Sequence, residues 1–165
     1  MLNIAYRMTG NYEEACEIVQ DAFVSAFKNI SNFKEQAKFS TWLCTIVINL
    51  SKNRLKQLKS QLYYERFSID DPVPTGESHI KAELASNEPS VIERLEKKEI
   101  QQKVQVCINS LEDELRETLV LRDIQGFSYD EISDILKIPE GTVKSRLSRA
   151  RDILKDCLKK VIGDV

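Results

Sequence analysis

The stretch that decides the fold lies at residues 128–158 and reads SYDEISDILKIPEGTVKSRLSRARDILKDCL. Ser128 precedes Glu131 by three residues, which is the spacing of a capping box and predicts the start of a short helix. Pro139 suits the first turn of a second helix, which we expect to run to about Val161. A short helix, a tight turn and a long helix together predict a helix-turn-helix.

The second of these helices has one apolar face and one basic face. The apolar positions recur at spacings of three and four and predict an inward face: Val143, Leu147, Ala150, Leu154 and Leu158. The outward face would carry Lys144, Ser145, Ser148 and Arg149, with Arg146 and Arg151 on its flanks. In a major groove, Lys and Arg donate to guanine edges and flanking cations contact the phosphates. The pattern favours DNA binding, and the alternative is an exposed basic face on a small helical hairpin.

Lys137 occupies the turn position where such motifs often carry glycine. Glycine accepts a left-handed backbone without strain, whereas a lysine there costs about 1 kcal/mol. We expect the fold to tolerate this cost.

The rest of the composition predicts an all-α protein. Only 5 Gly and 4 Pro occur in 165 residues, which argues against many short strands. The net charge of −2 hides two basic blocks, residues 36–60 and 140–160, on either side of an acidic stretch. We expect two small helical domains, residues 1–62 and 91–165, joined by an acidic flexible linker at 63–90, with the helix-turn-helix in the second domain.

Upstream helices follow from capping residues and apolar spacing. Asn11 with Glu14 predicts a helix start, and a second helix is expected from about Ser40 through Leu58. Ser110 with Asp113 predicts another start. The stripe of the first of these helices comprises Ala15, Ile18, Val19, Ala22, Phe23, Ala26, Phe27 and Ile30.

Aromatic and polar residues alternate before and within the helix that begins near Ser40. They are Phe33, Lys34, Lys38, Phe39, Thr41 and Trp42, followed by Asn49, Lys52, Asn53, Arg54, Lys56 and Lys59. Rings that stack on unpaired bases, beside cations that track phosphates, suit single-stranded DNA. The alternative is that Phe39 and Trp42 belong to the core, and the pattern alone leaves both open.

No pattern of catalytic or metal-binding residues is present in the sequence. Cys16, Cys44, Cys107 and Cys157 are far apart without a CxxC pair, which predicts free thiols and no disulfide framework. His79, the single histidine, lies in the polar stretch without partners. We therefore expect no enzyme, no cofactor and no metal. With no long apolar run and no signal peptide, we expect no membrane insertion and a cytoplasmic location.

Four segments together resemble a bacterial extracytoplasmic-function (ECF) sigma factor of the sigma-70 superfamily. They are MTGNYEEACEIVQDAFVSAF, NFKEQAKFSTWLCTIVINLSKNRL, LEDELRETLVLRDIQGFSYDEISDIL and KIPEGTVKSRLSRARDIL, in the order that the family has them. The resemblance implies a transcription initiation factor that binds core RNA polymerase and promoter DNA. It also implies an anti-sigma factor as a partner.

The resemblance assigns a role to each block of residues. Docking on polymerase clamp helices would use Glu14, Glu17, Gln20 and Asp21. Capture of a flipped base of the minus-ten element would use the loop from Phe33 to Lys38 with Phe39, Trp42 and Asn49. The DNA backbone of the same element would be held by Lys52, Asn53, Arg54 and Lys56. The minus-thirty-five element would be read by Lys144, Ser145, Ser148 and Arg149, with Arg122 and Arg146 on phosphate.

The start of the sequence and one alternative function need separate mention. The family carries a further helical stretch upstream of LNIAYRMTGN, so the sequence is expected to be a fragment or to have its start assigned too far downstream. The missing part would pack on Ile18 and Phe23.

The alternative function is that of a stand-alone LuxR-type helix-turn-helix regulator, whose N-terminal half should show an α/β pattern that this sequence lacks.

Overall fold

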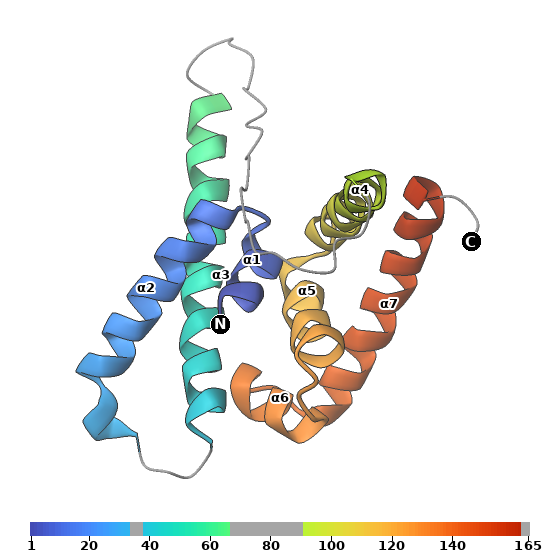
Figure 1. Cartoon of the computed structure of the whole chain (residues 1–165). Coiled ribbons are helices and arrows are strands. Elements are labelled where there is room, and N and C mark those ends of the chain that lie inside the picture. The colour runs from blue at the N-terminus through green and yellow to red at the C-terminus, as the bar shows by residue number, and fades with distance from the viewer. Residues whose placement is uncertain (34–37, 67–90, 163–165) are drawn as a thin grey trace.

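The computed structural model describes residues 1–33, 38–66 and 91–162, and every element within these ranges is a helix (Figure 1). The elements are α1 (Leu2–Thr9), α2 (Tyr12–Lys28), a 3-10 turn η1 (Ile30–Asn32), α3 (Phe39–Arg66), α4 (Val91–Asn109), α5 (Asp113–Leu119), a π-helical turn η2 (Val120–Ile124), α6 (Tyr129–Leu136) and α7 (Glu140–Ile162). The prediction of an all-α protein is confirmed.

Local capping explains where several helices begin and end. The Asn11 side chain accepts from the backbone N–H groups of Glu13 and Glu14 at 2.8 and 3.1 Å, as a helix N-cap does. Ser128 and Glu131 form the predicted capping box at the start of α6. Lys137 ends α6 in the left-handed conformation with φ 56°, as expected for its position.

Three predicted boundaries were wrong or incomplete. The short helix α1 was not predicted, because eight residues show too little of an apolar repeat. Helix α3 continues to Arg66, well past Leu58, because nothing in the intervening sequence interrupts a helix. Ser110 does not cap α5, which begins at Asp113, and its hydroxyl donates instead to the Cys107 carbonyl at 2.8 Å.

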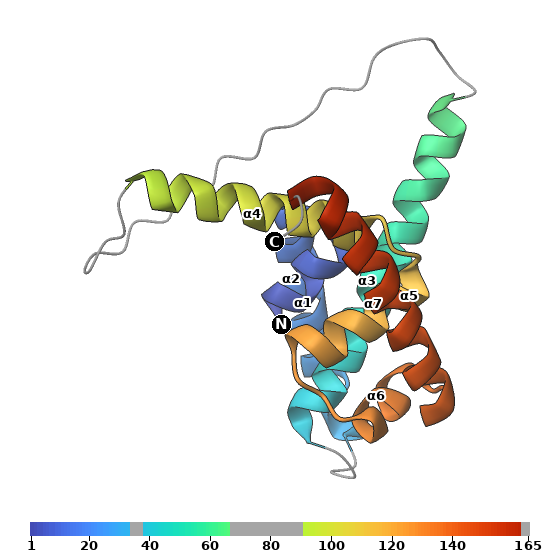
Figure 2. The same ribbon diagram turned by 90° about the vertical axis from the view of Figure 1, so that its right-hand side faces the viewer.

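The N-terminal half (α1–α3) and the C-terminal half (α4–α7) share one hydrophobic core. It joins Ile4, Met8, Val47 and Ile48 to Val120, Leu121, Ile132 and Val143, each at most 1% exposed. Helix α1 lies between α3 and α5 in Figure 1 and contacts α4, α5 and η2. The C-terminal end of α3 and the N-terminal end of α4 extend away from this shared core (Figure 2).

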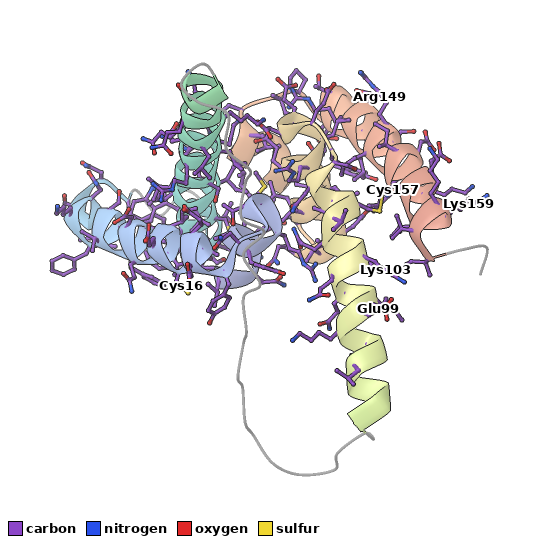
Figure 3. All side chains as sticks on the ribbon, turned by 90° about the horizontal axis from the view of Figure 1, so that it is seen from above. Cys16, Glu99, Lys103, Arg149, Cys157 and Lys159 are labelled. Carbon is purple, nitrogen blue, oxygen red and sulfur yellow. A yellow bond between two sulfur atoms is a disulfide. The ribbon has the colours of Figure 1, made fainter. Side chains whose placement is uncertain are left out.

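One prediction about the cysteines was wrong. Cys107 of α4 and Cys157 of α7 form a disulfide between residues 50 apart in sequence, whereas Cys16 and Cys44 are free thiols as predicted. Figure 3 shows Cys157 on the side of α7 that faces α4. The pairing depends on how these two helices pack, and the spacing of cysteines along the chain does not reveal that packing.

The described part of the chain contains neither a helix suited to cross a membrane nor a cluster suited to hold a metal ion. None of its helices combines the length and the apolar content that a membrane crossing needs. Within the same residues, no group of three His, Cys, Asp or Glu side chains is placed to hold a metal ion.

Candidate nucleic-acid interface

The helix-turn-helix presents the basic face that the sequence predicts. Val143, Leu147 and Ala150 are buried, while Leu154 and Leu158 are half-buried against the rest of the C-terminal half. On the opposite side of α7 the exposed residues are Lys144, Ser145, Ser148 and Arg149. Arg149 points away from the neighbouring helices in Figure 3. Four side chains of types that can hydrogen-bond to bases or phosphates are thus exposed together on one helix face.

The flanking arginines are engaged within the C-terminal half. Arg146 is ion-paired with Glu114 and lies 3.5 Å from Glu117, and its side chain is only 17% exposed. Arg151 donates to both carboxylate oxygens of Asp123 at 2.9 and 2.6 Å, and this hydrogen bonding raises the pKa of Arg151. These guanidinium groups brace α7 against α5 and η2.

Arg122 has a similar internal role. Its guanidinium donates to the Phe127 carbonyl at 2.7 Å and lies over the ring of Tyr129, 4.8 Å from the centroid. It therefore holds the segment between η2 and α6 in place. A phosphate contact by Arg122 or Arg146 would have to compete with these internal partners.

A buried arginine that the sequence analysis missed joins the two halves. Arg116 of α5 is 6% exposed and donates to the carbonyls of Ile108, Asn109 and Leu111, and also to that of Met8 in α1 at 2.8 Å. Its burial lowers the pKa of Arg116. The sequence gives one indication of this role: Arg116 is a charged residue in a helix whose apolar residues are spaced for burial.

Three aromatic rings gather before and within the first turn of α3. The centroids of Phe33 and Trp42 lie 5.2 Å apart, and Phe39 lies 5.7 Å from each of them. Phe39 is 43% exposed, while Phe33 and Trp42 are half-buried. The cluster is therefore a surface platform with one open ring, rather than part of the core.

The polar residues that were predicted around this platform fall into different environments. Lys34 lies outside the described residues, and Thr41 is buried with 6% exposure, so its side chain is not on the surface. The exposed members are Lys38, Asn49, Lys52, Asn53 and Lys56.

Arg54 links two surfaces that the sequence analysis kept apart. It forms a two-pronged ion pair with Glu14 and lies 3.4 Å from Glu17, and these contacts raise the pKa of Arg54. Arg54 was expected on the DNA backbone, and both glutamates were expected on polymerase. In the structure the three residues tie α2 to α3, and the exposed residues of the predicted docking face are Glu17, Gln20 and Asp21.

The second half of α2 and the start of η1 carry an exposed apolar patch, three of whose residues belong to the predicted apolar stripe. Phe23, Val24, Phe27 and Ile30 are 52%, 51%, 82% and 49% exposed. Of the predicted stripe, the buried residues are Ala15, Ile18, Ala22 and Ala26. The α2 patch, as we call these four exposed residues, lies next to Gln20 and Asp21 along the helix, and contiguous exposed apolar side chains mark interaction sites.

Comparison with known proteins gives a family match for each of the two helical halves. The Sigma-70 region 2 family matches residues 1–61, and the Sigma-70, region 4 family matches residues 101–154. The chain is 38% identical to the ECF RNA polymerase sigma factor SigW of Bacillus subtilis, over 94% of this chain and 81% of that protein. It is 30% identical to the RNA polymerase sigma-H factor of Pseudomonas aeruginosa, over 99% and 83% respectively.

Solved structures give the same result for the fold. The sigma factor RpoE of Bartonella quintana, in complex with the anti-sigma factor NepR, matches with a TM-score of 0.71 at 24% identity, over 96% of this chain and 89% of that one. CnrH, in complex with the cytosolic domain of CnrY, matches with a TM-score of 0.63 at 26% identity, over 96% and 80%. The fold and its surfaces define a helical transcription initiation factor. The chain belongs to the ECF family of RNA polymerase sigma factors, which bind core polymerase and promoter DNA.

Proposed function

We propose that this sigma factor recognises promoters through two separate contacts. The exposed face of α7 reads the minus-thirty-five element in the major groove, and the rings of Phe33, Phe39 and Trp42 capture a flipped base of the minus-ten element. The observation that carries the proposal is the division of α7, on which Lys144, Ser145, Ser148 and Arg149 are exposed while Val143, Leu147 and Ala150 are buried. The open Phe39 ring supports the second contact, because exposed rings stack on unpaired bases.

Docking on core polymerase would use the α2 patch together with Gln20 and Asp21. Phe27 is 82% exposed, which is unusual for a phenylalanine unless a partner covers it. This assignment moves the predicted docking face along α2, away from the glutamates that Arg54 occupies.

Strand opening follows from differential binding. Unstacking a base step costs a few kcal/mol, and a protein that uses no ATP must meet that cost by binding the opened form better than the closed one. The binding free energies of three contacts, to polymerase, to the minus-thirty-five duplex and to the flipped base, together favour the opened form. They combine because polymerase holds both halves of the chain near the same DNA. The chain would therefore act in the cytoplasm, where polymerase and promoter meet.

An anti-sigma factor is the further partner that we propose. The solved structure of CnrH, at 26% identity, holds the cytosolic domain of CnrY. A protein of this kind would hold the present chain away from polymerase until a signal releases it.

Reconstituted transcription tests the proposal directly. Core polymerase and the full chain would be used to select promoters from a random DNA library, and run-off transcription would then be measured on them. Arg149→Ala should lower transcription about 5- to 150-fold, the range expected for losing one good base contact. Trp42→Ala should lower it by a similar factor through lost stacking.

The control is Lys159→Ala, which removes an exposed cation farther along the same helix and should leave transcription unchanged. Unchanged transcription with both Arg149→Ala and Trp42→Ala would overturn the proposal. Duplex binding without any transcription from core polymerase would instead favour the stand-alone regulator.

A further inference from the structure

The ring of Tyr129 lies beside two cations of the C-terminal half. Tyr129 is the first residue of α6, and its ring centroid lies 4.8 Å from the guanidinium carbon of Arg122 and 5.6 Å from Lys144 Nζ. Both distances are within the range of about 6 Å over which an aromatic face attracts a cation. Lys144 is exposed on α7 and is one of the residues proposed to read the minus-thirty-five element. The ring therefore connects the first helix of the helix-turn-helix to a DNA-facing side chain of the second.

The local structure fixes the position of the Tyr129 ring. The capping box of Ser128 makes Tyr129 the first residue of α6, which sets its backbone conformation. The ring is half-buried and packs against the shared core and against a second apolar cluster that includes Leu147 of α7. Arg122 contacts the ring and also donates to the Phe127 carbonyl at 2.7 Å, so the turn before α6 is held to η2. A ring that is fixed by its backbone and by its packing offers a constant partner to a flexible side chain.

Lys144 has a competing partner on its own helix. Its Nζ atom lies 3.5 Å from a carboxylate oxygen of Glu140, one turn earlier, and both side chains are exposed. A carboxylate accepts a hydrogen bond from the ammonium and offsets its charge. An aromatic ring attracts the ammonium through its quadrupole and leaves N–H donors available. A lysine held by the ring can therefore still donate to a base, whereas a lysine that is fully engaged by Glu140 has fewer donors to offer.

The flexibility of lysine makes such a partner useful. Its ammonium group lies at the end of a four-carbon chain, and fixing that chain on DNA costs more rotamer entropy than fixing a shorter side chain. A contact that already restricts the side chain in the free protein reduces the entropy that is lost on binding. The same contact limits the directions from which the ammonium group reaches the DNA, so it also affects which base accepts the hydrogen bond.

We propose that Tyr129 is a positioning residue for promoter recognition: its ring holds the Lys144 ammonium group against the pull of Glu140, in place to donate to a base of the minus-thirty-five element. This inference rests on the proposed promoter function and deepens it, because it gives α6 a part in the contact made by α7. Tyr129 acts on the choice of base and not on polymerase binding, since it acts through Lys144.

Four variants of the full chain test the inference. Tyr129→Phe keeps the ring and removes only the hydroxyl, so it is the matched control. Tyr129→Leu keeps an apolar side chain and removes the ring. Lys144→Ala, and Tyr129→Leu combined with Lys144→Ala, complete a double-mutant cycle, which isolates the part of the Tyr129 effect that acts through Lys144.

The first readout is the proton NMR shift of the Lys144 ε-methylene group in the free chain, which requires neither polymerase nor DNA. Lys144→Ala identifies these signals by their loss. The ring current shifts protons above an aromatic face upfield, so the Lys144 signals should lie upfield of those of Lys159, an exposed lysine farther along α7, in the wild type and in Tyr129→Phe. In Tyr129→Leu they should coincide with the Lys159 signals.

Two results of this measurement overturn the inference whether or not the chain is a sigma factor. One is a wild-type Lys144 signal that already coincides with that of Lys159, which requires no variant to fold. The other is a Lys144 signal that is the same in Tyr129→Leu as in the wild type.

The second readout is the base preference of core polymerase reconstituted with each protein. It is the ratio of run-off transcription from promoters that differ at one base pair of the minus-thirty-five element, and this ratio is insensitive to the amount of folded protein. The base pair contacted by Lys144 is the one at which Lys144→Ala loses the preference. At that pair Tyr129→Leu should lower the preference about 2- to 5-fold, the range of a cation–π contact at an exposed site, and Tyr129→Phe should match the wild type.

The double-mutant cycle separates the possible failures. Once Lys144 is alanine, Tyr129→Leu should not lower the preference any further. An equal fall with and without Lys144, or an equal fall in Tyr129→Phe and Tyr129→Leu, overturns the positioning role and leaves the proposed function standing. A Lys144→Ala protein that keeps every base preference overturns the proposed reading of bases by Lys144, and the inference with it, even when the ring-current shift is present.

Discussion

The two surfaces proposed to contact DNA differ in what their cations face. On α7, Lys144 and Arg149 are exposed, and Lys144 lies 3.5 Å from Glu140 of its own helix and 5.6 Å from the centroid of the Tyr129 ring. On α3, Lys52 and Lys59 face carboxylates of the other half of the chain. The two basic blocks look equivalent in the sequence, but Lys52 and Lys59 of α3 are paired with the other half of the chain, whereas Lys144 of α7 is paired within its own helix.

The comparison shows that a basic block in the sequence predicts where cations lie but not whether those cations are free to contact DNA. The face of α7 is set by a local repeat of apolar residues, which determines what is buried and therefore what is exposed. The state of the α3 lysines is set by residues about sixty positions away, and these are brought near only when the halves pack. The following predictions test how far the two halves depend on each other.

The largest effect is expected from Arg116→Met, which would remove the residue that bridges the halves. Four backbone carbonyls, one of them at Met8 in α1, would lose their donor in a buried site. We expect the free energy of unfolding to fall by about 3–5 kcal/mol, because unsatisfied buried polar groups keep their full desolvation cost. Urea unfolding followed by circular dichroism would measure it, and a loss below about 1 kcal/mol would contradict the bridging role.

Removing the disulfide should affect only the C-terminal half. Cys157→Ser breaks the Cys107–Cys157 link and lets α4 and α7 separate in the unfolded chain. Loops of this length give about 2–4 kcal/mol of stabilisation per disulfide. Hydrogen exchange should rise in α4 and α7 and stay unchanged in α2 and α3. Equal increases in both halves would show that the shared core makes the chain a single cooperative unit.

The helix-turn-helix itself was the part of the fold that the sequence specified best. The capping box at Ser128, the left-handed Lys137 and the buried face of α7 are all local, so a short stretch of sequence contains the whole signal. The disulfide, the buried Arg116 and the ion pairs of Lys52 and Lys59 were not predictable, because each joins segments that are distant in sequence.

For the candidate docking site, the sequence predicted the apolar residues but not which of them are exposed. The apolar repeat over residues 15–30 predicted one apolar stripe, with a segment upstream of the sequence packed on Ile18 and Phe23, and in the structure Phe23, Phe27 and Ile30 are exposed. An apolar repeat predicts that a helix face will be covered, yet it does not say whether the same chain or a partner covers it. In the structure Ala15, Ile18, Ala22 and Ala26 are buried, while Phe23, Phe27 and Ile30 are exposed.

A smaller effect is expected from Ser128→Ala, which removes the hydroxyl that accepts from the Glu131 backbone N–H in the capping box of α6. Loss of an N-cap costs about 1 kcal/mol. The hydrogen bond from the Ser128 backbone N–H lowers the pKa of Glu131, so this carboxylate contributes stability above its unfolded pKa and loses it as the pH falls through the lower folded value. Alanine at position 128 keeps this backbone N–H, so the pH dependence is tested with Glu131→Gln: its thermal unfolding should differ from that of the wild type at neutral pH and converge with it in acid, and a constant difference would contradict the assignment.

The smallest effect should be a gain in stability. Lys137→Gly relieves the left-handed backbone at φ 56°, and we expect an increase of up to about 1 kcal/mol in the free energy of unfolding. Because the site lies between α6 and α7 and faces solvent, polymerase binding should not change. A destabilised Lys137→Gly protein would mean that the lysine side chain makes a contact that outweighs the backbone strain.

The measurement that tests the account most directly is co-elution of the full chain with bacterial core RNA polymerase on size exclusion, without DNA. We expect the wild type to co-elute. Phe27→Glu should abolish the complex without unfolding the chain, because that ring is 82% exposed on the α2 patch. Val106→Glu, which alters an apolar residue of α4 that is 61% exposed, should co-elute like the wild type. A wild-type chain that elutes apart from core polymerase would contradict the account.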